Sequence, residues 1–329
     1  MEKIISEYLN NLEIGKMQKF KNMIVFPFIS PEQKNLDYIT LTKALEADLI
    51  EIKEISKGGS IPNLKVINLS SKPVLLMDGE ELVGAKQNRI INSTILLKEK
   101  TDTVIPVSCT ESGRWSYRTD KFRDSGVISA QKVRLNKVKS VSSHLQNKQQ
   151  FYSNQGQVWD DIRDISDKMG VKSNTAAMKD VFDSKAKHLD AYIRNFEIIP
   201  EQTGLVVCIN NTIVGIDVVS LPAAYKELHH KLIKSYAIEA MKKKAEEKIK
   251  VNEAEVKRFI KEACTCKEIR YESVGYGWDY RYKSSNIIGS VLQYSDVIIH
   301  AAFFRNRKTN RYRRGRNDMD TLLFKNRIH

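Results

Sequence analysis

Alternating hydrophobic and polar positions dominate the chain, and stretches with the helical period of about 3.6 residues interrupt them. Alternation and short apolar runs predict strands at 23–29, 49–55, 64–69, 74–83, 89–97, 103–109, 204–209, 212–219, 268–274, 278–282, 287–292 and 297–304. Helical spacing predicts helices at 2–12, 40–47, 125–150, 158–169, 175–196, 220–248 and 253–263. The pattern predicts an α+β fold: an antiparallel β-rich module, a helical insertion at about 120–196, and long helices in the C-terminal half.

Turn residues divide two of these apolar stretches into predicted hairpins. Asp78-Gly79 stands between two apolar runs, and Asp-Gly favours the positive φ angles of a type I′ turn. Asn210-Asn211 joins two later strands, and Asn tolerates the left-handed conformation. We therefore expect a β-hairpin at each of these two positions.

Capping residues mark where two of the helices should begin. Thr40 precedes the first, and Ser220-Leu-Pro222 precedes the long helix of the C-terminal half. A Ser or Thr side chain can accept from the unpaired N–H groups of the first turn, where Pro is also tolerated. We expect the long helix to continue to about Lys248.

Length and composition set the class of the protein. The 329 residues are 41% hydrophobic and 29% charged, which is ample for a sizeable core. No run reaches the roughly 18 to 20 apolar residues that span a bilayer, and the charged start lacks the apolar region of a signal peptide. We therefore expect a cytoplasmic protein, in which Cys109 and Cys208, inside apolar runs, are buried reduced thiols.

The net charge of +14 is concentrated at the C-terminus. Residues 305–329 hold nine Lys or Arg against two Asp, and we separate this basic tail from a single domain over 1–304. A basic tail attracts polyanions such as nucleic acid or an acidic partner, although a solvated terminus has the same composition.

The densest polar cluster is 78–89, followed by Asn92, where two strands should otherwise be apolar. Polar groups there cost free energy unless they are solvated or paired. Glu80 and Glu81 should project to opposite sides of an extended strand, so at most one of them faces a given cleft. A carboxylate beside Lys86 and Arg89 could act as a general base or hold a metal.

Other side chains of this cluster suit recognition of a ligand. Gln87 and Asn88 each donate and accept hydrogen bonds, as recognition of an amide, ribose or base requires. Arg89 offers a planar fork that matches phosphate or carboxylate. The candidate ligand-binding residues here are Asp78, Lys86, Gln87, Asn88, Arg89 and Asn92. The alternative interpretation is a hairpin turn with exposed polar residues and a structural ion pair.

A second cluster, 108–115, ends a strand with Glu111, bends at Gly113 and presents Arg114 beside Trp115. An Arg next to an indole can hold a phosphate and stack a ring, so both are ligand-binding candidates. Glu80, Glu81 and Glu111 are the catalytic candidates, since a pair of carboxylates is enough for hydrolytic acid–base work.

A third cluster, 275–281, places two glycines around an aromatic residue, and Asp279 and Arg281 are its ligand-binding candidates. Two glycines give a tight loop that a ligand can approach closely. His300 follows on an apolar strand, where a satisfied core histidine is the expected role. Cys264-Thr-Cys266 is one residue short of the zinc spacing and has no second pair, so no metal site is predicted.

These motifs resemble those of the ARG-and-rhodanese-phosphatase-superfamily-associated protein domain family. The resemblance covers about residues 20–304, and its segments are 78–89 with Asn92, 106–111 with 113–115, Gly204 with 215–217, and 277–281 with Gly289, Ser290 and His300. The family's name records association with ADP-ribosylglycohydrolase and rhodanese-phosphatase proteins. The resemblance thus implies a role near ADP-ribose or phosphorylated metabolites in prokaryotic conflict systems, and it names no cofactor.

Two hypotheses follow, and they belong to different classes. The first is a hydrolase of a nucleotide-type substrate such as ADP-ribose, with the glutamates as acid–base and the arginines on the anion. The second is a module that binds nucleic-acid phosphates through the basic tail and the basic stretch 114–148. A structural partner of another protein, through the helices of 120–196, is a third, and the oligomeric state stays open.

Overall fold

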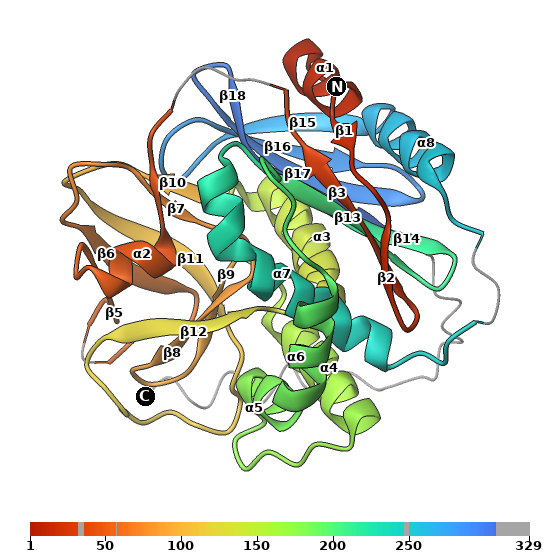
Figure 1. The fold of residues 1–329 in the computed structure, drawn as a ribbon. Coiled ribbons are helices and arrows are strands. Elements are labelled where there is room, and N and C mark those ends of the chain that lie inside the picture. The colour runs from red at the N-terminus through yellow and green to blue at the C-terminus, as the bar shows by residue number, and fades with distance from the viewer. Residues whose placement is uncertain (32–35, 57, 247–249, 307–329) are drawn as a thin grey trace.

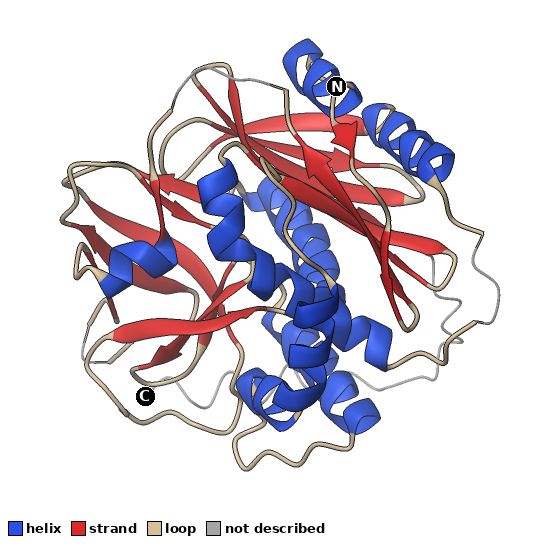
Figure 2. Cartoon of the chain, in the orientation of Figure 1, coloured by secondary structure: helices blue, strands red, loops and turns tan. Residues whose placement is uncertain are grey.

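The computed structural model describes residues 1–31, 36–56, 58–246 and 250–306. Two β modules lie on either side of a long helix, α7 (Pro222–Met241), in an α+β fold. Figure 1 shows the larger sheet on the right and the smaller module on the left, and Figure 2 shows a group of helices between and below them. The predicted fold class is confirmed, whereas the basic tail lies, from residue 307, outside the described residues.

The larger sheet has nine strands, all antiparallel to their neighbours. In spatial order they are β1 (Glu13–Ile14), β3 (Met23–Ile29), β13 (Gly204–Ile209), β14 (Thr212–Val219), β18 (Val297–Arg305), β17 (Ile287–Tyr294), β16 (Trp278–Lys283) and β15 (Lys267–Glu272), with β2 (Gln18–Phe20) also beside β3. Helices α1 (Lys3–Asn10) and α8 (Glu253–Cys264) cover one face (Figure 1). Because side chains alternate along each strand, Val206 packs toward these helices and Leu205 toward α7.

The smaller module encloses a separate apolar core between two sheets. Its six-stranded sheet has the order β12 (Phe122–Ile128), β8 (Glu80–Gly84), β9 (Arg89–Ile91), β11 (Asp102–Cys109), β6 (Asn63–Asn68) and β5 (Ile50–Lys53). The three-stranded sheet is β10 (Ile95–Leu97), β7 (Val74–Leu76) and β4 (Ile39–Thr40), next to α2 (Leu41–Glu46). Thr40 caps α2 as predicted, since its hydroxyl accepts from the Lys43 N–H at 3.4 Å.

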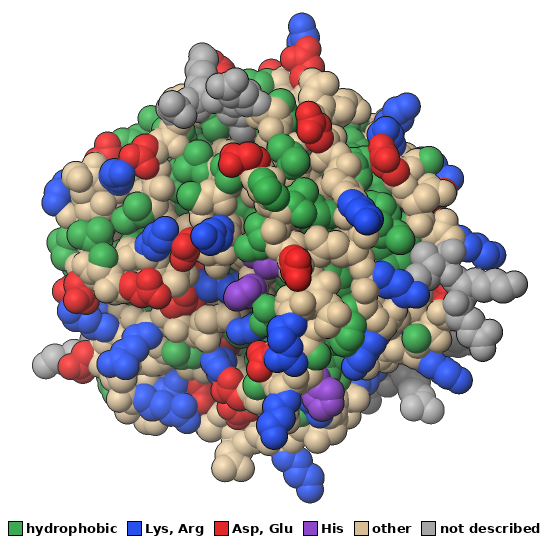
Figure 3. All heavy atoms as spheres, viewed as in Figure 1, with side chains coloured by type: hydrophobic (Ala, Val, Ile, Leu, Met, Phe, Trp, Pro, Cys, Tyr) green, Lys and Arg blue, Asp and Glu red, His purple; other side chains and the backbone are tan. Residues whose placement is uncertain are grey.

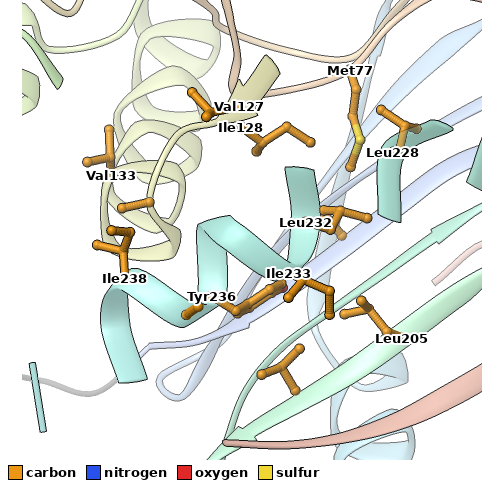
Figure 4. Packing of buried hydrophobic residues seen from close by; sticks show 14 of the residues in the cluster. Met77, Val127, Ile128, Val133, Leu205, Leu228, Leu232, Ile233, Tyr236 and Ile238 are labelled. Atoms are coloured by element: carbon orange, nitrogen blue, oxygen red, sulfur yellow. The ribbon is translucent and has the colours of Figure 1, made fainter. Parts of the chain in front are cut away.

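The largest apolar core joins the two modules. It includes Leu232 and Ile233 of α7, Ile128 of β12, Val133 of α3 (Gln131–Lys148) and Leu205 of β13, all nearly or completely buried. Figure 4 shows these side chains converging from three directions. The remaining helices pack around the same core: α4 (Gln155–Met169), α5 (Met178–Ser184) and α6 (Ala186–Asn195). The modules are thus held together by the helical region.

The helical insertion begins later than the sequence predicts. Residues 122–128 form strand β12, and the first helix of the insertion, α3, starts at Gln131. The polar segment Asp124-Ser125-Gly126 hides this strand because it forms an irregular register against β8, with Gly126 at φ +74°. The prediction of a helix from residue 125 was therefore wrong for its first turns.

Asp78-Gly79 forms a turn, but the predicted hairpin is wrong. The Glu80 N–H donates to the Met77 carbonyl at 3.1 Å, and Gly79 has the positive φ of +85° that the turn requires. The flanking strands do not pair, since β7 lies between β10 and β4 while β8 lies between β12 and β9. The turn carries the chain from one sheet of the smaller module to the other.

The long helix differs from its prediction at both ends. Leu221 is its N-cap residue and makes no side-chain cap, while the Ser220 hydroxyl is 2.8 Å from the Tyr38 hydroxyl. The helix ends at Met241 rather than near Lys248. The hairpin at Asn210-Asn211 is confirmed by β13 and β14. Within the described ranges, every helix is too short or too polar to cross a membrane.

Candidate functional site

Two of the three sequence clusters meet at one end of the paired strands β9 and β11, in the six-stranded sheet. In the antiparallel pair of β9 and β11, Cys109 stands directly opposite Arg89, and the Thr110 N–H donates to the Asn88 carbonyl at 2.9 Å. Segments 85–89 and 108–115 therefore lie side by side although about 20 residues separate them. The third cluster lies on β16 of the larger sheet.

Most polar side chains of the clusters are buried, so the alternative of exposed polar residues is wrong, although the structural ion pair that it included is present, as in Glu80–Lys231. Buried polar groups need hydrogen-bond partners, and their partners reveal what each one does. Fully or almost fully buried are Asp78, Glu80, Glu81, Gln87, Asn88, Arg89, Asn92, Glu111, Arg114, Asp279 and Arg281. Of the residues in the predicted site, Lys86 is only partly buried and Trp115 is exposed.

Asp78 belongs to what we call the central ion cluster: Asp78, Arg134, Lys137, Asp217 and His300. Arg134 donates to Asp217 at 2.5 and 3.0 Å and to Asp78 at 3.3 Å. Lys137, one helical turn further along α3, donates to Asp78 as well. The cluster joins the smaller module, α3 and the larger sheet, and its ionic groups balance in charge.

Asp217 is the most heavily bonded member of the central ion cluster. It also accepts from the Tyr236 hydroxyl at 2.6 Å and lies 3.3 Å from His300 Nε2. His300 Nδ1 is 2.7 Å from the Thr94 hydroxyl, so His300 is the satisfied core histidine that we predicted. Burial alone would raise the pKa of Asp217, but the Arg134 charge and the bonds from His300 and Arg134 lower it to about 2.

Glu80 faces α7, where a second buried ion group surrounds Lys231. The Lys231 ammonium donates to Glu80 at 2.7 Å, to Asp124 at 2.6 Å and to Thr42 at 2.8 Å. The other Glu80 oxygen accepts from the Met77 N–H at 2.8 Å. Both carboxylate oxygens of Glu80 are thus occupied by the protein itself.

Glu81 projects to the opposite side of β8, as the strand geometry predicts. Its Oε1 accepts from the Thr110 hydroxyl at 2.7 Å, whereas Oε2 is buried with no hydrogen-bond partner among the described residues. Burial raises the pKa of Glu81 to about 7, and the hydrogen bond from Thr110 offsets only part of that rise. Glu81 can therefore exchange a proton near neutral pH.

Glu111 and Arg114 hold each other at the end of β11. Arg114 donates to Glu111 at 2.6 and 2.9 Å, and the Asn88 N–H donates to the same oxygen at 3.2 Å. Burial would raise the pKa of Glu111, but the hydrogen bonds from Arg114, Thr175 and Asn88 lower it below its ordinary value. Arg114 also donates to the Ala85 carbonyl at 2.6 Å, so its guanidinium is engaged with the protein on several sides.

Arg89 and Glu54 form an ion pair that is not closed by a hydrogen bond. Their nearest atoms, Nη2 and Oε1, are 3.6 Å apart, against roughly 2.7–2.9 Å for a charge-assisted hydrogen bond. Arg89 Nη1 donates to Gln87 at 3.1 and 3.3 Å. Its Nε and Nη2, and both oxygens of Glu54, are buried without a hydrogen-bond partner in the described part of the chain. We call these two residues the open pair.

The sequence pattern did not single out Glu54. It follows β5, in which Ile50 and Ile52 face the apolar core. The same two-residue period places Glu54 on that buried face, and an acid in the next inward position of an apolar series is the signal that could have found it.

An aromatic cover, defined by Lys86, Trp115 and Tyr117, lies beside the open pair. Trp115 and Tyr117 are 46% and 47% exposed, and the Lys86 ammonium is 5.2 Å from each ring centroid. The Arg89 guanidinium carbon is 5.7 Å from the Trp115 ring centroid. The cover thus combines two solvent-facing rings with a cation, next to a buried guanidinium.

The third cluster and Asn92 lie away from the aromatic cover. Asn92 accepts from the Ser108 hydroxyl at 2.7 Å and donates to the Phe151 carbonyl at 3.0 Å. Arg281 donates to Asp279 at 2.7 Å, and its guanidinium carbon is 5.7 Å from the Phe151 ring centroid. The predicted ligand-binding residues therefore divide between two places in the fold.

The buried cysteines are confirmed. Cys109 and Cys208 are free thiols inside the cores. Burial raises the pKa of Cys109 to about 11 and that of Cys208 to about 12. A thiol with so high a pKa has little thiolate at neutral pH, so the geometry gives Cys109 no nucleophilic role.

Comparison with known proteins finds one family. The sequence profile described as the ARG and Rhodanese-Phosphatase-superfamily-associated Protein domain matches residues 11–304, which include both β modules and the whole helical region. No curated protein and no solved structure matches the chain.

Proposed function

The chain belongs to the ARG and Rhodanese-Phosphatase-superfamily-associated Protein domain family, and we propose that its domain binds a phosphorylated nucleotide of the ADP-ribose type at the open pair. The observation that carries the proposal is that Arg89 and Glu54 are buried as a charged pair without closing hydrogen bonds. Unmade hydrogen bonds of buried ionic groups cost several kcal/mol in general, so a ligand that supplies them gains affinity.

The open pair has the donors and acceptors that such a nucleotide needs. Nε and Nη2 of Arg89 lie on one edge of the guanidinium and can hold two phosphate oxygens in parallel. The Glu54 carboxylate can accept from ribose hydroxyls. The side-chain amide of Gln87, next to Arg89, can both donate and accept hydrogen bonds. Anion and sugar recognition thus come from adjacent side chains.

The aromatic cover supplies the remaining part of the ligand's recognition. An adenine ring stacks on an exposed indole or phenol with roughly 1–3 kcal/mol per base. Trp115 and Tyr117 are such rings, and Lys86 between them adds a positive charge next to the phosphate position. Binding at the buried Arg89 requires the Trp115 side chain to move aside, and its exposed position leaves room for that movement.

In the hydrolase form of the proposal, Glu54 is the general base. It is the carboxylate nearest to Arg89, and both of its oxygens lack a hydrogen bond. Glu80 and Glu111 are already bonded by Lys231 and Arg114, and they position the strands around the site. The association with ARG and rhodanese-phosphatase proteins in the family's name is consistent with this ligand class.

Thermal unfolding of the wild type and of Trp115→Ala, with ADP-ribose, NAD, nucleoside phosphates and a short oligonucleotide, tests the proposal. We expect ADP-ribose at about 100 times its dissociation constant to stabilise the wild type by about 2.7 kcal/mol. The shift should shrink in Trp115→Ala and disappear in Arg89→Lys, which keeps the charge but loses the fork. Trp278→Ala is the matched control, because Trp278 is 37% exposed and lies over Arg270 on the other sheet.

A shift that is equal in Trp115→Ala and Trp278→Ala would contradict the proposal. A shift with the oligonucleotide alone would favour the nucleic-acid module instead. Two observations weigh against that module: Arg134 and Lys137 of the basic stretch are buried in the central ion cluster, and Figure 3 shows acidic and basic side chains interspersed on the face it displays.

A further inference from the structure

A small cavity lies between α3 and the hairpin of β15 and β16, in the larger sheet. Its volume is about 70 Å³, and its lining is largely apolar surface, to which Ser142, Gln146, Lys267, Tyr271, Arg281 and Lys283 contribute. One buried water needs roughly 10–15 Å³ of such space, so the cavity has room for a group of several heavy atoms. We call it the Arg281 cavity.

Arg281 lines this cavity and keeps one unused donor group. Its Nε and Nη2 donate to Asp279, and the ring of Phe151 lies across its face at 5.7 Å. Nη1 is buried and has no hydrogen-bond partner among the residues that the structure describes. The guanidinium is therefore fixed in position while one donor group remains for a ligand.

The strand register adds an excess of positive charge at the same place. Lys267 stands directly opposite Lys283, and the next pair on that face is Ile269 with Arg281. Like charges directly opposite each other destabilise an antiparallel pair. Asp279 offsets the charge of Arg281. An anion on this face of the two strands would offset the charges of Lys267 and Lys283.

Two lysines of α3, Lys137 and Lys139, lie within the electrostatic influence of Arg281 and Lys283. Burial, followed by the Arg281 charge, lowers the pKa of Lys137. Burial also lowers the pKa of Lys139, and the Lys283 charge adds to this effect against Asp161. In both cases burial is the larger cause, and a nearby positive charge acts in the same direction.

We propose that the Arg281 cavity binds a tetrahedral oxyanion, either inorganic phosphate or the phosphoryl group of a small phosphomonoester. Arg281 Nη1 and the two lysine ammonium groups donate to its oxygens, and the Tyr271 hydroxyl lies along the lining as a further donor. This site is separate from the open pair, since none of the residues that line it belongs to the open pair or to the aromatic cover.

Titration calorimetry with inorganic phosphate, at ionic strength held constant with chloride, tests this proposal on the full chain. We expect saturable binding to the wild type and an affinity about tenfold weaker in Lys283→Gln, because one charge-assisted hydrogen bond is lost. Lys283 is exposed, so its substitution leaves the core intact. Lys261→Gln, an exposed lysine on α8, is the matched control and should bind as the wild type does.

Further variants and probes make the result specific. The double variant Asp279→Asn/Arg281→Gln, which leaves no unpaired buried charge, should lose phosphate binding, while Trp115→Ala should retain it. Ribose 5-phosphate binding as tightly as phosphate would identify a phosphomonoester whose remainder extends out of the cavity, and weaker binding would identify free phosphate. Absence of saturable binding to the wild type, or equal affinity of Lys283→Gln and Lys261→Gln, would overturn the proposal.

Discussion

Asp217→Ala should destabilise the protein by roughly 3–5 kcal/mol. The substitution removes the acceptor of two Arg134 hydrogen bonds and of the Tyr236 hydroxyl, and it leaves a completely buried guanidinium with Asp78 as its remaining acid. Removing one partner of a buried ion pair costs this much because the other charge stays in a low-dielectric interior. Urea unfolding at neutral pH measures the loss.

Asp160→Ala is the control for that measurement. Asp160 forms an ion pair of the same type, at 3.0 Å from Arg163, but the two side chains are 60% and 63% exposed. Exposed pairs contribute roughly 0–1 kcal/mol, so this variant should unfold close to the wild type. Equal midpoints for Asp217→Ala and Asp160→Ala would mean that the central ion cluster does not hold the two modules together.

Glu81→Gln should make the stability of the protein less sensitive to a rise in pH from about 4.5 to 7. Burial raises the Glu81 pKa from 4.5 to about 7. Well below pH 4.5, Glu81 is protonated in both the folded and the unfolded state, so its contribution to the unfolding free energy is fully present. As the pH rises toward 7 the unfolded state ionises first, so the wild type loses about 3 kcal/mol that the amide variant keeps.

Urea unfolding between about pH 4.5 and 8 measures this difference. The gap in unfolding free energy between Glu81→Gln and the wild type should grow by about 3 kcal/mol over that range and level off above about pH 7. Glu13→Gln, at an exposed strand position, is the control and should give a curve that follows the wild type. Parallel curves for Glu81→Gln and the wild type would show that Glu81 does not titrate in the folded protein.

The secondary structure was largely predictable because burial and period agree in most elements. Strand β3 at Met23–Ile29 and helix α8 at Glu253–Cys264 lie within a residue of their predictions, since their apolar positions repeat regularly. One exception is β12, in which Asp124, Ser125 and Gly126 break the alternation. Asp124 binds Lys231 of α7, and a partner 107 residues away leaves no local signal.

The sequence singled out the polar segments but not which of their side chains would lie together. Segments 78–89 and 108–115 stood out because polar groups interrupt apolar strands, and the structure places residues 85–89 beside 108–115 at one end of β9 and β11. Their side chains bind partners on different elements, among them α3 and α7, and therefore differ in role. Glu54 escaped notice because a single acid after a strand is common, and its meaning depends on Arg89 across the sheet.

The most direct test of the central claim is the fluorescence of Trp115 during titration with ADP-ribose. The chain has three tryptophans, so Trp159→Phe/Trp278→Phe leaves Trp115 as the only one. Stacking of adenine on the exposed indole, or its displacement from Arg89, should change the emission saturably, and Arg89→Lys in the same background should abolish the change. Constant emission up to millimolar ADP-ribose in the folded double variant would contradict binding at the open pair.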